Sequence, residues 1–323
     1  MARALITGGA GYLAASLTRD LLAGGSSVRR MFRAGKTAPE APAGGAVEDF
    51  IGDVTERGDV GRAVRDVDVI FHLASQTSVY VAEADPALDV TANVLPMLHI
   101  LEACRALGTR PTVILAGTVT QAGIPRTLPV DEGVPDDPCT IYDVHKLVAE
   151  RYLKHFSRNG VVRGATLRLA NVYGPGPKSS RADRGVLNAM VRKALAGEAL
   201  KLYGSGEYLR DYVYVEDASR AFALAAQNPE AIDGHHFVLG TGVGHTLAAA
   251  VRLVAELVGE RLGRVVPVEH VAPPASLSPI ETRNFVANPA HLCRATGWQP
   301  EVSLRAGISR TIDYFSRTEE ERT

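Results

Sequence analysis

Tyr142 and Lys146 are the residues whose types and spacing most clearly indicate chemistry. Side chains four positions apart on a helix share a face, so the phenol and the ammonium would lie one turn apart. A free phenol has a pKa near ~10 and exchanges protons poorly at neutral pH unless a nearby positive charge stabilises its anion. Lys146 can supply that charge, and Thr118, just after the predicted strand 112–116, adds a hydroxyl. A helix that carries both residues by chance is the alternative; otherwise the set indicates proton transfer at a hydroxyl or carbonyl group.

A second pattern stands at the N-terminus, where the apolar run 4–6 leads into Gly8, Gly11 and Ala14. The spacing, between a predicted strand and a predicted helix over 13–23, is that of a dinucleotide-binding loop. Its glycines let the backbone approach a pyrophosphate at a helix N-terminus. A nucleotide site combined with a Tyr/Lys pair predicts redox chemistry.

The second predicted strand, 28–33, should end near the adenosine ribose and carries no Asp or Glu. An acidic residue there would hold the ribose 2′-hydroxyl of NAD, whereas an arginine would accept the 2′-phosphate of NADP. Arg33 is the predicted phosphate contact, with Lys36 or Arg30 as alternatives, and a solvated basic strand end is the competing interpretation. NADP (NADPH) is therefore favoured, with NAD as the alternative. Asp53, which follows a strand, would either bond the adenine amino group or cap a helix.

The arrangement of elements predicts the fold. Short aliphatic runs alternate with helical patterns up to residue 169, which predicts an α/β, Rossmann-like, doubly wound parallel sheet with helices on both faces. A Gly/Pro-rich turn over 173–177 then begins a smaller C-terminal substrate-binding lobe, and 211–215 should return to the main sheet. The expected division is a dinucleotide-binding domain of 1–170 and 211–240, and a lobe of 171–210 and 241–323.

Composition excludes several classes of protein. The formal charge is -1, from 35 Lys+Arg and 36 Asp+Glu, without a basic block that would bind nucleic acid. Cys104, Cys139 and Cys293 are far apart and show no metal-ligand spacing, so we expect reduced thiols and no metal. No uninterrupted apolar run approaches the ~20 residues that span a bilayer, and the first strand leaves no room for a signal peptide. We expect a cytoplasmic protein without a membrane partner.

The chain resembles the extended short-chain dehydrogenase/reductases that act on nucleotide sugars, and the likeness covers nearly its whole length. The motifs that carry it are Thr7-Gly8-Gly9-Ala10-Gly11, Phe71-His72-Leu73-Ala74, Tyr142-x-x-x-Lys146, Asn171-Val172-Tyr173-Gly174-Pro175, Arg210-Asp211-Tyr212-Val213 and Thr296-Gly297-Trp298-Gln299-Pro300.

This resemblance implies roles for individual residues. Tyr142 would be the acid/base, Lys146 would bind the nicotinamide ribose and tune Tyr142, and Thr118 would hydrogen-bond the reacting oxygen. The other implied cofactor contacts are Gly8, Gly11, Tyr12, Leu13, Arg33, Asp53, Val54, Leu73, Ala74 and Asn93.

The substrate side is implied in the same way. Asn171 would contact the sugar-nucleotide phosphates, and Arg210 and Arg283 would clamp the pyrophosphate, which suits their forked guanidinium groups. Asn188 and Tyr203 would bind the phosphate and the base. An ion pair with Asp211 is the alternative for Arg210, and core packing is the alternative for Tyr203.

The reaction is narrowed by two positions. Dehydratases of the family carry Asp-Glu after the catalytic Thr and decarboxylases carry a Glu there, whereas this chain has Val119-Thr120. Segments 116–123, 142–147 and 183–192 look most like those of dTDP-4-keto-6-deoxyhexose 4-ketoreductases of deoxysugar biosynthesis. We therefore predict NADPH-dependent 4-keto reduction of a dTDP-linked sugar.

Two alternatives stay open. An NAD-dependent nucleotide-sugar 4-epimerase with retained cofactor is one, favoured by the motif at 171–175. A non-catalytic nucleotide-binding sensor on the same fold is the other. A homodimer could form through apolar stripes of the helices at 90–107 and 142–156, although burial within one chain explains these stripes equally well.

Overall fold

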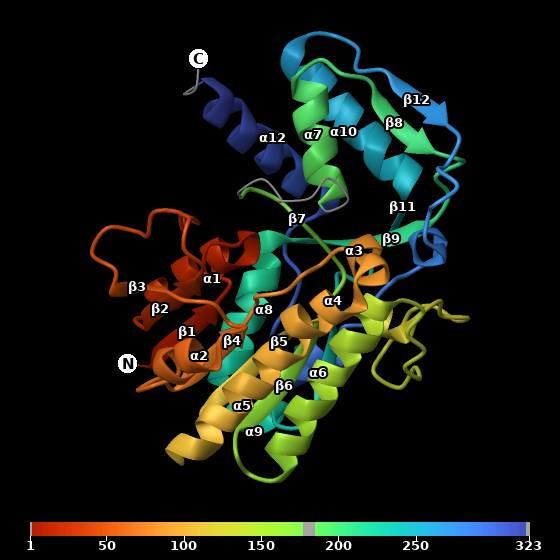
Figure 1. Ribbon diagram of the computed structural model, residues 1–323. Coiled ribbons are helices and arrows are strands. Elements are labelled where there is room, and N and C mark those ends of the chain that lie inside the picture. The colour runs from red at the N-terminus through yellow and green to blue at the C-terminus, as the bar shows by residue number, and fades with distance from the viewer. Residues whose placement is uncertain (1, 177–184, 321–323) are drawn as a thin grey trace.

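A computed structural model describes residues 2–176 and 185–320, with side chains described up to residue 317 (Figure 1). Pro177, Asp183 and Arg184, which belong to segments used in the sequence analysis, lie outside these ranges. A seven-stranded sheet forms the larger body, in the order β10-β6-β5-β4-β1-β2-β3. Every neighbouring pair in it is parallel, so the predicted Rossmann-like α/β fold is confirmed. The strands are β1 (Arg3–Thr7), β2 (Ser27–Phe32), β3 (Val47–Ile51), β4 (Val69–His72), β5 (Thr112–Thr118), β6 (Arg163–Leu169) and β10 (His236–Leu239).

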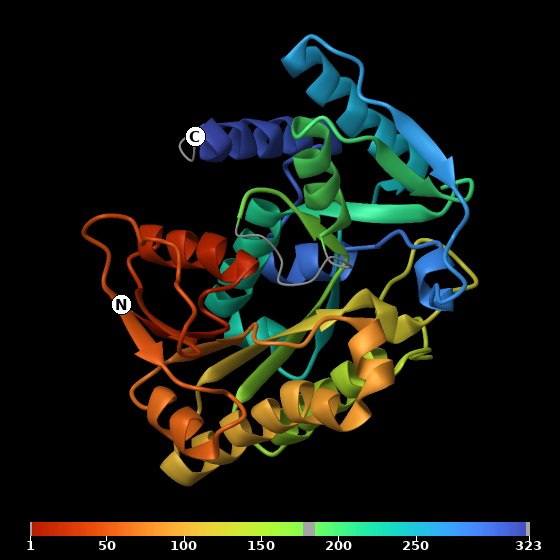
Figure 2. The ribbon, with the colours of Figure 1, turned by 45° about the horizontal axis from the view of Figure 1, so that its top comes forward.

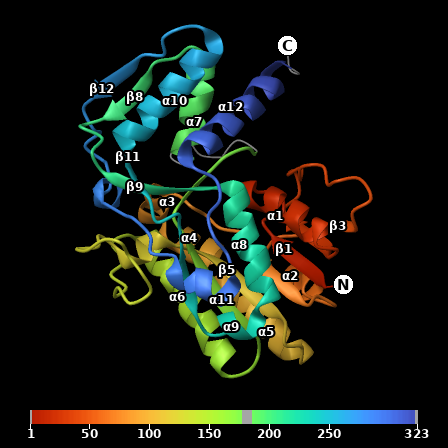
Figure 3. The same ribbon diagram turned by 180° about the vertical axis from the view of Figure 1, so that it is seen from behind.

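Helices cover both faces of this sheet (Figures 2 and 3). On one face, a buried cluster that includes Ile70, Met97 and Leu153 joins the strands to α2 (Arg57–Ala63), α5 (Leu95–Leu107) and α6 (Ile141–Arg158). Two shorter helices, α3 (Val79–Ala84) and α4 (Pro86–Asn93), pack on α6. On the other face, a cluster around Phe71 and Phe222 joins α1 (Tyr12–Ala23), α8 (Val215–Gln227) and α11 (Ala290–Thr296), with α9 (Pro229–Ile232) against β6. Burial on both faces explains why the central strands β1, β4 and β5 are largely apolar.

The strand order fixes where a ligand should bind. The chain moves from β1 outward through β2 and β3, and then returns to β4 on the opposite side of β1. In open parallel sheets, ligands bind outside the carboxyl ends of the strands at such a reversal. This edge of the sheet faces the lobe that lies above it in Figure 1.

The lobe has its own small sheets and core. β7 (Asn171–Tyr173), β9 (Leu209–Tyr214) and β11 (Gly244–Thr246) form one sheet, and β8 (Leu200–Tyr203) pairs with β12 (Val268–Val271). Helices α7 (Val186–Leu195), α10 (Leu247–Leu262) and α12 (Leu304–Glu320) surround a separate apolar cluster. The remaining short helices are the 3-10 turns η1 (Val119–Ala122) and η2 (Pro279–Thr282).

Two predicted placements differ from the structure. The prediction that 211–215 returns to the main sheet is wrong, because β10 occupies the edge of β6 and β9 instead pairs with β7 and β11. In the range assigned to the lobe, Leu292 and Trp298 pack in the core of the large sheet, and the indole Nε1 of Trp298 donates to the backbone oxygen of Asp217 at 2.8 Å. The proposed division into two domains stays a prediction.

One apolar segment has the length of a membrane span. Among the described residues, Pro86–Leu107 alone is long and apolar enough by length and composition, with 22 residues and a mean hydropathy of 1.2. It comprises α4 and α5, and Met97, Ile100 and Leu101 within it are fully buried in the core. Core helices of soluble proteins meet the same criterion, so the segment is weak evidence for a membrane.

Candidate active site

The glycine loop between β1 and α1 packs closely against the segment that follows β4. Gly8 has a φ of +70°, and a Cβ on it would lie 2.9 Å from the backbone nitrogen of Ala74 at the end of β4. A side chain at this position would therefore be both strained and obstructed. The amide of Gly11 donates to the Gly8 oxygen at 2.7 Å, and Gly11 caps α1 without a side chain. The loop thus brings bare backbone and a helix N-terminus to the strand reversal, which fits a dinucleotide pyrophosphate.

A side-chain hydrogen bond between Thr7 and His72 joins the ends of β1 and β4 beside this loop. The Thr7 hydroxyl lies 2.8 Å from Nδ1 of His72, and the amide of Ala74 donates to the same hydroxyl at 3.3 Å. Burial, with a contribution from the charge of Lys146, lowers the pKa of His72 to about 3. His72 is therefore neutral near pH 7 and holds the strand ends rather than exchanging protons.

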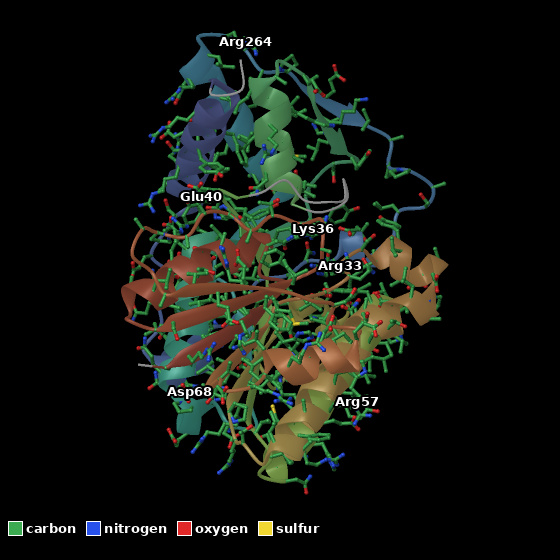
Figure 4. The ribbon with its side chains drawn as sticks, turned by 60° about the vertical axis from the view of Figure 1, so that its left-hand side comes forward. Arg33, Lys36, Glu40, Arg57, Asp68 and Arg264 are labelled. Carbon is green, nitrogen blue, oxygen red and sulfur yellow. The ribbon has the colours of Figure 1, made fainter. Side chains whose placement is uncertain are left out.

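The basic end of β2 contains one structural arginine and two exposed cations. Arg30 is 5% exposed and donates from Nε and Nη2 to Asp49 at 2.7 and 3.0 Å, so it is not available as a phosphate ligand. Arg33 and Lys36 are exposed at the end of the sheet that faces the lobe, opposite Asp68 (Figure 4). Their side chains make no hydrogen bond or ion pair within 2–176 and 185–317, the residues whose side chains the structure describes.

Asp53 builds a turn rather than a helix cap. Its Oδ1 accepts from the amide and the hydroxyl of Thr55, both at 2.9 Å, whereas Glu56 is the N-cap of α2. The helix-cap alternative is therefore wrong, and contact with the adenine remains a prediction. Val54 packs partly buried against the same core as α2, and its carbonyl lies 3.3 Å from Nδ1 of His99.

Thr118 and Tyr142 line the same cavity, and Lys146 lies one helical turn after Tyr142 on α6, outside the cavity wall. Thr118 ends β5, and Thr140 caps α6 by accepting from the amide of Asp143 at 3.2 Å, which starts the helix just before Tyr142. Lys146 is only 3% exposed. Burial lowers the pKa of Lys146 to about 8, although the carboxylates of Asp89 and Glu150 oppose this change. The ammonium is thus retained at pH 7 in a site from which water is largely excluded.

A cavity of about 140 Å³ opens beside the Thr118 and Tyr142 side chains. Asn171, at the start of β7, and Arg283, just after η2, line the same cavity. The Oδ1 atom of Asn171 is buried without a hydrogen-bond partner among the described residues, which is costly unless a ligand supplies a donor. The remaining lining residues are Thr77, Val79, Val119, Thr120, Leu169, Ala170, Ile280 and Glu281.

Arg210 stands behind this cavity rather than in its wall. It is 6% exposed, and its guanidinium donates to the backbone oxygens of Leu209, Glu281 and Arg283. The carboxylate of Asp211 instead accepts from the residues around Thr241, so the alternative of an Arg210–Asp211 ion pair is wrong. Arg210 therefore fixes the segment that presents Arg283, and its predicted contact with a pyrophosphate remains untested.

Asn93, Asn188 and Tyr203 also lie outside the cavity wall. Asn93 donates to the Gln76 oxygen and to Asp89, both at 2.9 Å, so it orders the loop after β4. Asn188 forms two hydrogen bonds with the backbone of Gly174, at 3.0 and 2.9 Å, and holds the turn after β7. Tyr203 is 47% exposed, which excludes core packing.

Tyr12 connects the nucleotide loop with the lobe. Its ring lies so close to Gly176 that a Cβ there would approach within 2.4 Å. Leu13 and Leu73 pack partly buried against the core of the α1 face.

Sequence reasoning missed part of the cavity wall. Neither the 3-10 turn η2, which supplies Ile280 and Glu281, nor the short helix that begins at Val79 was predicted. The only sequence signal for η2 was the polar cluster next to Arg283.

The comparisons with known proteins agree with this geometry. A profile of the NAD dependent epimerase/dehydratase family matches residues 4–240. The chain belongs to this family. It is 30% identical over 318 residues to a UDP-glucose 4-epimerase of Mycolicibacterium smegmatis, covering 97% of this chain and 98% of the relative.

Solved structures extend the likeness to three dimensions. The UDP-glucose 4-epimerase of Thermus thermophilus, in complex with NAD, is 32% identical, with a TM-score of 0.83 and coverage of 97% and 99% of the two chains. That of Thermotoga maritima, with UDP-glucose, is 28% identical, with a TM-score of 0.87 and coverage of 98% and 99%. These similarities favour the epimerase alternative over the predicted 4-ketoreductase, and NAD over NADP.

Proposed function

We propose that this protein is an NAD-dependent 4-epimerase of a UDP-linked sugar. The observation that carries the proposal is the cavity that joins Thr118 and Tyr142 to Asn171 and Arg283. The full-length similarity to UDP-glucose 4-epimerases supports the same reaction and the same nucleotide.

In this proposal some cavity and helix residues transfer the proton and others bind the nucleotide sugar. The loop of Gly8 and Gly11 and the ammonium of Lys146 would hold NAD, which would supply the hydride acceptor and then the hydride donor for carbon 4. Tyr142 receives the proton of the 4-hydroxyl and gives it back, Lys146 stabilises the tyrosinate, and Thr118 hydrogen-bonds the reacting oxygen. Such positioned acid/base help contributes typically ~10²–10⁴ in rate. Arg283 and Asn171 hold the diphosphate end, where a guanidinium forms charge-assisted hydrogen bonds.

Val119 and Thr120 support epimerisation over dehydration or decarboxylation. Elimination and carboxylate loss recruit an additional carboxylate after the catalytic hydroxyl residue, and neither side chain here provides one. Both residues line the cavity, so the difference lies at the reacting centre itself.

A second candidate is the NADPH-dependent 4-ketoreductase acting on a dTDP-linked 4-keto-6-deoxyhexose. The specific observation in its favour is the end of β2, which offers the exposed cations Arg33 and Lys36 and no acidic residue for a ribose 2′-hydroxyl. The same hydride and proton transfers would then run once, in the direction of reduction.

We also propose a cytoplasmic homodimer that pairs α5 and α6 of two copies. Val144 and Tyr152 on α6 are each 37% exposed and Leu107 at the end of α5 is 41% exposed, which leaves apolar surface on this side of the molecule. Sedimentation of the purified protein tests the dimer.

The deciding experiment uses purified protein in two reactions. UDP-glucose without added cofactor should yield its 4-epimer, and NAD should be released when the protein is denatured. NADPH with dTDP-4-keto-6-deoxyglucose should show no catalytic loss of NADPH. Net oxidation of NADPH with a 4-hydroxy product would instead establish the second candidate.

The variant Tyr142→Phe separates catalysis from binding. It should lower turnover by at least ~10²-fold while the amount of bound NAD stays close to that of the wild type. Near-normal turnover of this variant would refute the assigned role of Tyr142 in either reaction.

A further inference from the structure

Thr118 is held first through its backbone. Its amide donates to Oε1 of Gln121 at 3.1 Å, and the amide nitrogen of the Gln121 side chain donates to Oε2 of Glu150 at 3.0 Å. Gln121 and Glu150 are both fully buried. The end of β5 is therefore tied to α6, and only the side-chain rotation of Thr118 remains to be set.

The backbone amide of Thr120 donates to Oγ1 of Thr118 at a long 3.3 Å, and a chain of hydroxyl groups adds the closer contact that sets the rotation. Oγ1 of Thr118 lies 2.7 Å from Oγ1 of Thr120, and the Thr120 hydroxyl donates to Oδ1 of Asp143. Asp143 is fully buried, and its Oδ2 accepts from the hydroxyl of Thr140 at 2.7 Å. A hydroxyl has one proton, and that of Thr120 is used by the carboxylate, so Thr118 must be the donor to Thr120. The chain runs in one direction, from Thr118 through Thr120 to Asp143.

We propose that Thr120 and Asp143 are positioning residues that hold the Thr118 oxygen in the one rotamer suited to the reacting oxygen. A threonine side chain otherwise has several staggered positions. Thr118 and Thr120 both line the cavity, and Asp143 directly follows Tyr142 on α6. The chain therefore fixes the hydroxyl of Thr118 relative to the helix end that carries the phenol.

This inference rests on the proposed role of Thr118 but not on the direction of the redox reaction. An epimerase and a 4-ketoreductase both require a hydroxyl at a fixed distance from the phenol. Its test therefore uses whichever of the two reactions the wild type catalyses, and the wild-type rate alone reports on the proposed function.

A double-mutant cycle tests the positioning role. Thr120→Val should lower kcat by about tenfold, the effect of about one hydrogen bond, with a smaller change in KM. In a background of Thr118→Val it should cause no further loss, because it acts through Thr118. Thr120→Ser should restore most of the rate. Thr311→Val, which removes a buried hydroxyl from α12 far from the cavity, is the matched control and should leave kcat unchanged.

A readout without turnover accompanies the cycle. In protein labelled with ¹³C at the threonine methyl groups, the three-bond couplings of the Thr118 methyl report its side-chain rotamer. We expect one rotamer in the wild type and in Thr120→Ser, and averaging in Thr120→Val, or in Thr120→Ala if the valine variant does not fold.

The outcomes distinguish the positioning role of Thr120 from the proposed function. Rotamer averaging together with a loss of rate that vanishes in the Thr118→Val background supports the inference. Losses that multiply in the double variant, or an unchanged Thr118 rotamer in Thr120→Val, overturn it. If the wild type turns over no nucleotide sugar, the proposed function fails, and the rotamer measurement alone still decides for or against the positioning role.

Discussion

Replacing Glu150 by Gln should destabilise the protein strongly, because Glu150 is the centre of a buried charge network beneath the active site. Its carboxylate is fully buried and accepts from Arg168 at 2.9 and 2.8 Å and from Lys154 at 2.6 Å. Burial alone would raise the pKa of Glu150, but the hydrogen bonds and charge of Arg168, with help from Lys154, lower it from 4.5 to about 2. At about 1.4 kcal/mol for each pH unit, this lowering corresponds to about 3 kcal/mol of stability.

The direction of the pH dependence follows from the same pKa values. A carboxyl group whose pKa is lower in the folded protein stabilises it fully above the unfolded pKa, near 4.5, and less as the pH falls toward about 2. Glu150→Gln should therefore reduce the free energy of unfolding in urea by about 3 kcal/mol at pH 7, and by less at pH 4. The control is Asp313→Asn, which breaks an exposed pair with Arg261 and should cost less than about 1 kcal/mol. A loss below about 1 kcal/mol for Glu150→Gln at pH 7, or the same loss at both pH values, would refute the reasoning.

Three further predictions concern the active site. Burial lowers the pKa of Lys146 to about 8, so kcat/KM should decline as the pH rises through that value and the ammonium loses its proton. In pH–rate profiles, Lys146→Arg should move this decline to higher pH. A decline at the same pH in the variant would show that another group causes it. Arg283→Ala should raise KM for the nucleotide sugar by about 10- to 100-fold, whereas Arg210→Ala, which removes donors to backbone carbonyls, should chiefly lower Tm; steady-state kinetics and thermal melts would contradict this if the two variants behaved alike. Arg33→Ala should weaken NADPH binding by about tenfold and NAD binding little, as measured by fluorescence titration, and equal losses for both cofactors would exclude a contact with the 2′-phosphate.

The placement of the candidate catalytic side chains on their helix and strand could be predicted from local patterns, for a physical reason. Tyr142 and Lys146 are related by helix geometry, which four residues of sequence determine, and Thr118 follows a strand whose apolar run is unmistakable. The glycine loop is similarly local, because Gly8 and Gly11 require only the strand before them and the helix after them.

Contacts between distant segments were not predictable in this way. Arg210 and Arg283 look equivalent in the sequence. In the structure, Arg210 donates its hydrogen bonds to backbone carbonyls about 70 residues later in the chain, whereas Arg283 lines the cavity. Arg30 and Arg33 differ for the same reason, since only the pairing of β2 with β3 brings Asp49 to Arg30. The position of β9 depended on which strand occupies the edge of β6, and this is decided by packing of the whole chain.

The cavity wall bears on the choice between epimerisation and reduction. A 4-epimerase must return the hydride to the opposite face of the sugar, so the ring has to turn between the two transfers while the nucleotide stays bound. Arg283 and Asn171 can anchor the phosphate end, whereas the rest of the wall mixes the apolar side chains of Val79, Leu169 and Ile280 with the polar side chains of Thr77, Thr120 and Glu281. The polar side chains offer hydrogen bonds from more than one direction, so the wall is compatible with both ring orientations that a 4-epimerase requires. It is equally compatible with the single orientation that a reductase requires, and the assay with the two substrates decides between the two reactions.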